Sequence, residues 1–179
     1  MGWAYHTERG DVPRKPRFYV PDIPVHVVPR GNDRQAVFYG DADYQAYRHW
    51  LREGAQRYGN AIHAYVLMTN HVHLLLSPSG KDSIVRLTQY LGRHYVMYVN
   101  YTYGRTGTLW EGRYKASLIQ EEAYLLACYR YVELNPVRAE MVNGPSQYRW
   151  SSYHHNALGK KDPIVTPHRL YNALSRSDA

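Results

Sequence analysis

Four short runs of β-prone residues predict strands along the chain, at 25–28, 62–68, 71–76 and 117–119. The second run shows the clearest alternation, because apolar residues stand at every other position from Ile62 to Met68. Only Thr69 and Asn70 separate it from the third run. The second and third strands are therefore predicted to pair as a hairpin.

Apolar residues three and four positions apart predict three helices, over 42–58, 82–100 and 121–134. Gly59 and Asn60 end the first helix, and Asn135 and Pro136 follow the last. The β-α-β-β-α-β order of the first six elements predicts an α+β, ferredoxin-like (RRM-like) core with an antiparallel sheet. Its helices are expected on one face of the sheet, which leaves the other face open for chemistry or nucleic acid.

The chain divides into three segments. Residues 1–22 are punctuated by proline and carry a basic cluster, so they are expected to form an arm rather than a packed element. Residues 23–144 hold all of the predicted strands and helices. Residues 145–179 are aromatic and basic, and they are expected to form an extension that packs on the core.

The composition fits one globular domain with a nucleic-acid partner. The chain has 179 residues, of which 44% are hydrophobic, enough to bury a core. Its formal net charge of +7 favours a polyanion, because each phosphate that a basic side chain neutralises releases counterions. There are 19 Tyr against 2 Phe, and most of these rings are expected at the rim of the core.

Cys128 is the only cysteine, so an internal disulfide is excluded and a reducing compartment is indicated. The N-terminal residues lack the apolar run of a signal peptide, and no stretch of the sequence is long and apolar enough to span a bilayer. A soluble, cytoplasmic protein without a membrane partner is therefore expected.

His71 and His73 are the first candidates for chemistry. They point to the same face of a predicted strand, with Cα atoms about 7 Å apart, so both imidazoles can bind one divalent cation. The alternative is two half-exposed strand histidines without a ligand. Spacing alone does not separate these interpretations.

Tyr131 and Asn135 supply a second pair of candidates, because residues i and i+4 of a helix are neighbours on one face. The Asn135 amide oxygen is a hard donor that suits Mg²⁺ or Mn²⁺. The alternatives are that Asn135 only caps the helix that begins at Pro136, and that Tyr131 is a core ring. Nearby Tyr124 and Tyr129 are expected to be such core rings.

A tyrosine nucleophile explains why a metal is needed. A phenol is a weak nucleophile until it loses its proton, and a neighbouring cation favours the phenolate. The resulting phosphotyrosine diester preserves the bond energy for rejoining. The absence of a G-x-x-x-x-G-K-[ST] phosphate loop from the sequence is consistent with a reaction that does not use ATP.

These residues lie in blocks that resemble the HUH-type single-strand transposases, and more narrowly the REP-associated tyrosine transposases of the IS200-like superfamily. The metal-binding strand of that family is similar to 68–76, and its nucleophile helix is similar to 131–139. The resemblance extends to 30–34, 107–115 and 148–153, and so covers nearly all of the chain from about Arg14.

The resemblance implies that residues 23–144 form an HUH catalytic domain that binds Mg²⁺ or Mn²⁺ through His71, His73 and Asn135. It implies that Tyr131 attacks DNA and leaves a 5′-phosphotyrosine and a free 3′-OH. The substrates it implies are single strands with palindromic hairpins beside a short guide sequence, in the bacterial nucleoid. Relatives work as homodimers or monomers, and the long C-terminal segment places this chain nearer the monomers.

Seven basic residues are expected to contact DNA phosphates, namely Arg14, Lys15, Arg17, Arg30, Arg34, Arg113 and Lys115. Trp110, Trp150 and Tyr153 are expected to pack on the core, whereas His26 is expected to be structural and His63 exposed. Two other functions stay open at this point. One is a phosphodiesterase in which the histidines activate water, and the other is a module that only binds nucleic acid through its sheet.

Overall fold

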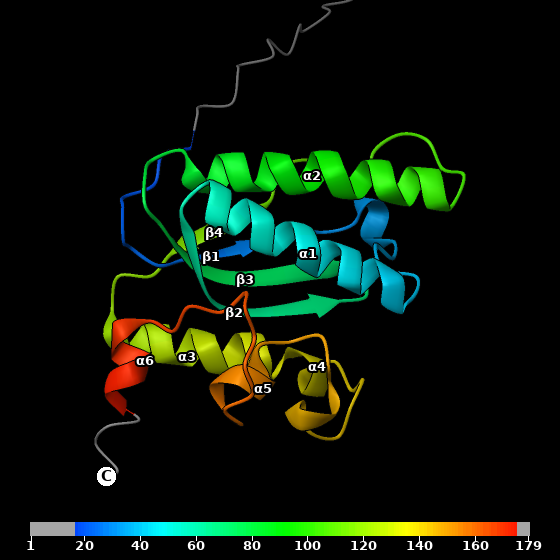
Figure 1. The fold of residues 1–179 in the computed structure, drawn as a ribbon. Helices are drawn as coiled ribbons and strands as arrows, with labels where there is room; N and C mark the ends of the chain where they lie inside the picture. Colours follow the sequence, from blue (N-terminus) through cyan, green and yellow to red (C-terminus); the bar gives the residue numbers. More distant parts are fainter. Residues whose placement is uncertain (1–16, 175–179) are drawn as a thin grey trace, which may run out of the picture.

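The computed structural model describes residues 17–174, which form one antiparallel sheet covered on both faces by helices (Figure 1). The four strands lie in the order β2-β3-β1-β4, with bounds Asn60–Met68, His71–Pro78, Val25–Val28 and Lys115–Leu118. This order, with one helix between β1 and β2 and one between β3 and β4, is that of a ferredoxin-like fold. The predicted fold class is therefore confirmed.

The predicted hairpin is also present. Met68 pairs with His71, so Thr69 and Asn70 alone make the turn between β2 and β3. A register shift between Ile62 and Ala64 interrupts the ladder once. The register matters for function, because it decides which β3 side chains share a face with those of β1.

Helices α1 (Asp41–Arg57) and α2 (Ser83–Thr102) cover one face of the sheet (Figure 1). Each buries one stripe: Tyr47, Leu51 and Ala55 in α1, and residues from Ile84 to Val99 in α2. Both helices agree with the sequence prediction to within two residues at each end. Short 3₁₀ turns occur at Asn32–Arg34 (η1) and Pro145–Gln147 (η2).

The expectation of an open second face is wrong. Helix α3 (Glu122–Glu133) packs on β2 and β3 from the side opposite to α1 and α2 (Figure 1). It buries an apolar stripe of its own, Leu125, Cys128, Tyr129 and Val132. A third amphipathic helix needs a hydrophobic surface, and the uncovered face of the sheet provides it. Three short helices follow α3 in the chain, α4 (Asn135–Arg138), α5 (Tyr153–Asn156) and α6 (Arg169–Leu174).

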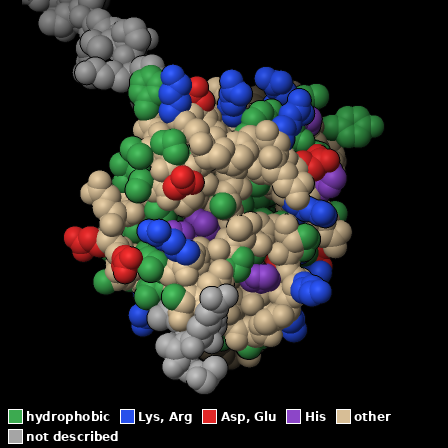
Figure 2. All heavy atoms as spheres, turned by 60° about the vertical axis from the view of Figure 1, so that its left-hand side comes forward, with side chains coloured by type: hydrophobic (Ala, Val, Ile, Leu, Met, Phe, Trp, Pro, Cys, Tyr) green, Lys and Arg blue, Asp and Glu red, His purple; other side chains and the backbone are tan. Residues whose placement is uncertain are grey.

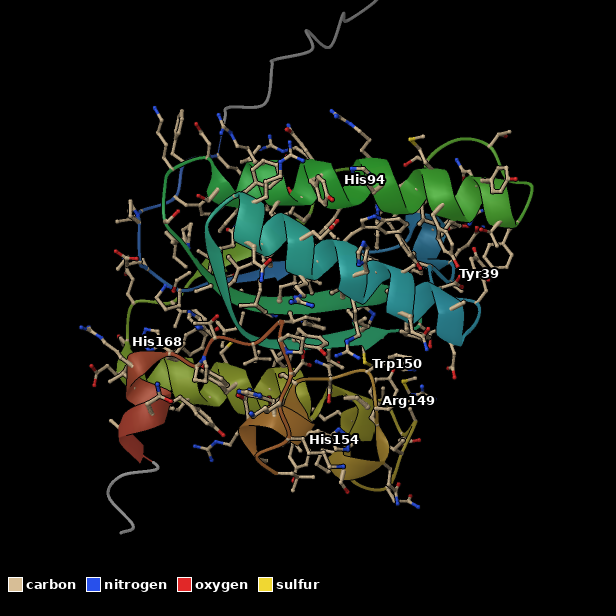
Figure 3. All side chains as sticks on the ribbon, viewed as in Figure 1. Tyr39, His94, Arg149, Trp150, His154 and His168 are labelled. Atoms are coloured by element: carbon tan, nitrogen blue, oxygen red, sulfur yellow. The ribbon has the colours of Figure 1, made fainter. Side chains whose placement is uncertain are left out.

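The C-terminal segment runs along the outer edge of β2. The Leu67 N–H donates to the Trp150 carbonyl at 2.9 Å, and the Thr166 N–H donates to the Ile62 carbonyl at 2.7 Å. Trp150 lies below the first turns of α1, where it stacks on Tyr44 (Figure 3). The segment thus pairs the edge groups of β2 that would otherwise face solvent.

His63 is buried, at 3% exposure, so the expectation that alternation would expose it is wrong. Its Nδ1 lies 2.8 Å from the Thr166 carbonyl and its Nε2 lies 2.8 Å from Ser77 Oγ. The C-terminal segment covers the face of β2 that would be exposed to solvent in an isolated hairpin. Burial lowers the pKa of His63 to about 4.

The many tyrosines form the core itself as well as its rim, because their hydroxyl groups find buried acceptors. Tyr95 donates to the Val37 carbonyl at 2.6 Å, and Tyr148 donates to the Leu67 carbonyl at 2.6 Å. A ring that is apolar over its body and hydrogen-bonded at its tip can be buried without leaving a polar group unpaired.

Asp43 collects the largest set of these bonds. Its carboxylate is fully buried and accepts from the N–H groups of Tyr39 and Gly40 at the start of α1. It also accepts from the hydroxyls of Tyr98 and Tyr103, near the end of α2. One carboxylate therefore joins the two helices that cover the first face.

Replacing Asp43 by alanine should lower the free energy of unfolding by about 3 kcal/mol, because several donors lose a charged acceptor at once. Tyr98→Phe removes one of these bonds and should cost about 1 kcal/mol. Urea denaturation followed by circular dichroism measures both values. Equal losses for the two variants would show that Asp43 does not act as a shared acceptor.

The lowered pKa of His63 predicts a loss of stability in acid. In the unfolded chain His63 binds a proton near pH 6.5, whereas in the folded chain it does so only near pH 4. The free energy of unfolding therefore falls as the pH drops from 6.5 to 4. Between pH 7 and pH 5 the wild type should lose about 2 kcal/mol more than His63→Gln. Denaturant midpoints at both pH values test this, and parallel losses would contradict it.

Candidate active site

His71 and His73 lie on the face of β3 that α3 covers. Their ring centroids are 4.9 Å apart, and His73 is buried while His71 is half-buried. The intervening Val72 points into the core on the other side, as alternation predicts. Packing by α3 therefore encloses the pair at the inner wall of a site rather than on an open sheet.

His26 belongs to the same cluster, through the register of β1 on β3. It pairs with Leu75, which makes His73 its diagonal neighbour on the same face. The two rings are nearly parallel, with centroids 5.0 Å apart, and His26 Nε2 lies 2.8 Å from His73 Nδ1. His73 Nε2 is buried and has no hydrogen-bond partner among residues 17–174.

The histidines are held in the neutral state that a metal ligand requires. Burial, with the charge of Arg30, lowers the pKa of His71 to about 4. Burial and then the neighbouring His26, His71 and Arg30 lower the pKa of His73 to about 3. Burial also lowers the pKa of His26. At neutral pH each of these rings therefore keeps one nitrogen with a free electron pair, which can bind a cation.

Tyr131 reaches this cluster from α3. Its ring makes edge contacts with His73 at 5.6 Å and with His26 at 5.8 Å between centroids, and its side chain is 41% exposed. The Arg138 guanidinium lies 5.1 Å from the Tyr131 ring centroid. Tyr131 is thus accessible to a substrate while its ring contacts the histidines.

His26, Tyr131 and Arg138 line a cavity of about 440 Å³. The rest of its wall is formed by Tyr124, Ala127 and Cys128. Tyr124 is 57% exposed here, so the expectation that it is a core ring is wrong. It lies seven residues before Tyr131 and thus two helical turns away on the same face. Tyr129, by contrast, is a core ring as expected, at 2% exposure.

Cys128 is a third possible nucleophile in the cavity wall, beside Tyr124 and Tyr131. It is buried, and burial raises the pKa of its thiol to about 11. The thiolate is the reactive form, so Cys128 is inert near neutral pH. Of the two exposed tyrosines in the wall, Tyr131 is the one whose ring contacts His26 and His73.

Asn135 lies in the first turn of α4, directly after the tyrosine helix. Its Nδ2 donates to the Tyr131 carbonyl at 3.4 Å, which turns the amide oxygen away from the helix. Within residues 17–174 no hydrogen bond joins Asn135 to His71 or His73, and its side chain bonds to Tyr131 instead. It does not form the side-chain cap that the alternative interpretation supposed.

Within the described range no three His, Cys, Asp or Glu side chains form a metal-binding group. The nitrogen donors that the site offers are the two imidazoles of His71 and His73, which leave positions for oxygen ligands. The residues fit a divalent cation in one respect above all, because His73 Nε2 is a buried lone-pair donor without a partner.

Four of the expected DNA contacts meet in a second cavity of about 460 Å³, lined by Val28, Arg30, Arg34, Glu111, Gly112, Arg113 and Lys115. Arg30 bridges to His71, and Lys115 pairs with Val28, so their side chains share the sheet face of the histidines. The basic cavity therefore adjoins the site. Further basic side chains (blue) lie along the top of the molecule in Figure 2, over α1 and α2.

The other three expected DNA contacts lie in the N-terminal arm. Arg14 and Lys15 fall outside the described residues. Arg17 packs its guanidinium 4.7 Å from the Tyr114 ring centroid and donates to the Tyr114 carbonyl. Tyr19 is buried and its N–H donates to the Lys81 carbonyl at 3.3 Å, so Arg17 and Tyr19 contact the core, whereas Phe18 and Val20 are exposed.

Sequence patterns gave no role to Asn70, His26 or Arg138, although all three contact the candidate site residues. Asn70 Oδ1 lies 2.7 Å from His71 Nδ1. His26 was expected to be structural, and only the β1–β3 register reveals its contact with His73. Arg138 stands seven residues after Tyr131, a spacing that two turns of helix bring together.

A sequence profile of the family described as "Transposase IS200 like" matches residues 19–135, about two thirds of the chain. The chain belongs to the IS200-like transposase family. Its members cleave DNA and transfer strands, so this protein is a transposase. No helix between residues 17 and 174 combines the length and hydrophobicity that crossing a bilayer requires.

The fold is similar to that of a REP-associated tyrosine transposase solved in complex with a REP hairpin. The two are 19% identical, with a TM-score of 0.69 over 89% of this chain and 93% of that one. A protein assigned as a transposase from Deinococcus radiodurans matches 67% of this chain and 95% of its own, at 22% identity and a TM-score of 0.48. No curated protein sequence matches the chain significantly.

Proposed function

We propose that this transposase is a metal-dependent endonuclease and strand transferase that acts on hairpin-bearing single-stranded DNA through a 5′-phosphotyrosine. The observation that carries the proposal is the contact of an accessible tyrosine, Tyr131, with His73, whose buried Nε2 lacks a partner. The similar structure holds a REP hairpin, which supports hairpin DNA as the substrate class of this chain and its place in the REP-associated group.

His71, His73 and Asn135 are the residues that would hold Mg²⁺ or Mn²⁺. A cation bound there supplies charge that neutralises the scissile phosphate and favours the phenolate. His71 and His73 contribute neutral nitrogens at physiological pH, because burial lowers the pKa of both. Asn135 contributes an oxygen from the element that directly follows the nucleophile helix.

Tyr131 carries the covalent step. Its Oη loses a proton and attacks the phosphorus, the bond from phosphorus to the 3′-oxygen breaks, and that oxygen takes a proton to become a free 3′-OH. The 5′ end stays on Tyr131 as a phosphodiester. An incoming 3′-OH reverses the same step, which joins a new strand without an external energy source.

Arg138 assists through its charge and its position. Its guanidinium lies 5.1 Å from the Tyr131 ring centroid, and both residues line the same cavity. A cation there favours the negative oxygen of Tyr131 and draws a phosphate toward it.

The cavity that Arg30, Arg34, Arg113 and Lys115 line is the proposed place for the phosphates next to the cleaved one. It adjoins His71 on the same sheet face, and Glu111 is its single acidic residue. Because Tyr131 contacts histidines of its own chain, one chain carries the whole catalytic set. This arrangement supports a monomer as the active form, in preference to a homodimer.

Tyr131→Phe should abolish the covalent adduct with a labelled hairpin oligonucleotide in the presence of Mn²⁺ and leave oligonucleotide binding within about twofold, because phenylalanine keeps the ring and loses only the nucleophile. Tyr124→Phe is the matched control, because it removes the other exposed phenol of the same cavity and should retain the adduct. A denaturing gel reads both.

An adduct with Tyr131→Phe would disprove the assignment. Cleavage by the wild type without any adduct would favour activated water as nucleophile, and binding without cleavage would favour a module that only binds nucleic acid.

Lys115→Ala and Arg34→Ala should each weaken hairpin binding several-fold and reduce the slope of log K against log salt by about 1, because each removes one phosphate contact. Arg86→Ala is the control, since Arg86 is exposed on α2 at the opposite face of the sheet. Fluorescence anisotropy across a series of KCl concentrations measures both quantities. An equal effect of Arg86→Ala would show that net charge, not the cavity, holds the DNA.

A further inference from the structure

The hydrogen bonds around His73 restrict where its proton can lie. A neutral imidazole carries one proton, on either Nδ1 or Nε2. His73 Nδ1 faces His26 Nε2 at 2.8 Å, whereas His73 Nε2 is buried and has no partner within residues 17–174. A proton on Nε2 would be a buried donor without an acceptor, so Nδ1 is the favoured position. His26 then accepts at Nε2 and carries its own proton on Nδ1.

The bonds around His71 lead to the same tautomer by a different route. Asn70 Nδ2 donates to the Arg34 carbonyl at 2.9 Å, and a carbonyl can only accept, so the orientation of the amide is fixed. Its Oδ1 therefore faces His71 Nδ1, at 2.7 Å, and can only accept as well. The proton of His71 lies on Nδ1, and its Nε2 keeps the lone pair.

We propose that His26 and Asn70 are positioning residues that fix the tautomer and ring plane of His73 and His71, so that both Nε2 lone pairs are presented to one divalent cation. The proposal rests on the proposed function and adds the residues that position its metal ligands. Metal-binding histidines in proteins commonly donate their other N–H to such a partner, which raises ligand basicity and fixes the ring.

Asn70 also ties the metal site to the basic cavity. Its carbonyl accepts from the Gly31 N–H at 2.8 Å while its side chain holds the Arg34 carbonyl. Both contacts clamp the tight segment 31–34, in which a Cβ at Gly31 would come within 2.2 Å of the Gln35 carbonyl oxygen. The same asparagine thus positions one proposed metal ligand and the turn that carries Arg34, directly after Arg30.

The first test uses the protein without metal. Two-bond ¹H–¹⁵N spectra of ¹⁵N-histidine-labelled protein distinguish the tautomers of a neutral imidazole. We expect His71 and His73 to carry the proton on Nδ1 in the wild type, and His73 to lose this preference in His26→Phe. A wild-type His73 with its proton on Nε2 would overturn the proposal for His26, and the same result at His71 would overturn it for Asn70.

The second test measures Mn²⁺ affinity by titration calorimetry. His26→Phe keeps a flat ring for the nearly parallel stack but removes the acceptor, whereas His26→Gln keeps an acceptor and removes the ring. Positioning predicts that the phenylalanine variant binds Mn²⁺ about 10- to 100-fold more weakly and that glutamine restores most of the affinity. A packing role predicts the reverse order, and that order would overturn the proposal.

His94→Phe is the matched control. His94 stacks on Trp50 from α2, on the far side of the sheet from β3's histidines (Figure 3). The same substitution there should leave Mn²⁺ affinity unchanged. Thermal unfolding of each variant shows that a loss of affinity does not arise from a loss of fold.

Asn70 is tested by a pair of variants that separate its two bonds. Asn70→Asp keeps an acceptor for His71 but loses the donor to the Arg34 carbonyl, so it should retain Mn²⁺ affinity and weaken hairpin binding. Asn70→Ala should weaken both by about tenfold. Unchanged Mn²⁺ affinity in Asn70→Ala would overturn the role of Asn70.

The experiments distinguish a failure of the proposed function from a failure of the positioning proposal. If the wild type does not bind Mn²⁺, the metal in the proposed function is wrong, and the metal-free spectra still decide whether His26 and Asn70 set the tautomers. If the wild type binds Mn²⁺ and His26→Phe binds it equally well, the positioning proposal is wrong and the proposed function stands.

Discussion

The packing of α3 on the second face of the sheet determines most of what this protein can do. Its buried stripe, which includes Leu125, Tyr129 and Val132, fixes the rotation of the helix against β2 and β3. Tyr131, between two stripe residues, is then held at the margin of the interface, beside His73. The same contact removes water from the histidines and lowers their pKa values, so that they remain neutral donors. The positions of the proposed nucleophile and of the proposed metal ligands thus depend on one hydrophobic contact.

A buried carboxylate fastens the end of that helix. Glu133 accepts from Ser152 Oγ at 2.6 Å and from Asn156 Nδ2 at 2.7 Å, and burial raises its pKa. Both partners belong to the C-terminal segment that also pairs with the edge of β2. Tyr131 lies two residues before Glu133, so the position of the nucleophile depends on residues about twenty positions later. In this chain the C-terminal segment is part of the support for the active site.

Most buried side-chain donors and acceptors among residues 17–174 are paired, and the exceptions are Arg48 Nε, Asn60 Oδ1, His73 Nε2 and Asn156 Oδ1. The tyrosine hydroxyls of the core find carbonyls or Asp43, and His63 has a partner at each ring nitrogen. His73 Nε2 is an exception, and it lies beside the nucleophile. His63 and His73 are both buried and lie on adjacent strands, so burial does not distinguish them. Hydrogen-bond partners at both ring nitrogens identify His63 as structural, and the unpaired Nε2 supports His73 as a proposed ligand.

The sequence by itself determined the elements, their order and the pairing of functional residues that lie close together in the chain. Alternation and helical spacing depend on local backbone geometry, so they placed His71 with His73 and the Tyr131 helix before Asn135. Only the tertiary structure decided what covers each face, because an apolar stripe does not say against which surface it packs. It buried His63 and exposed Tyr124, against expectation. It brought His26 to His73 through strand register, and Arg30 to Lys115 across 85 positions, because contacts between distant residues depend on the whole chain.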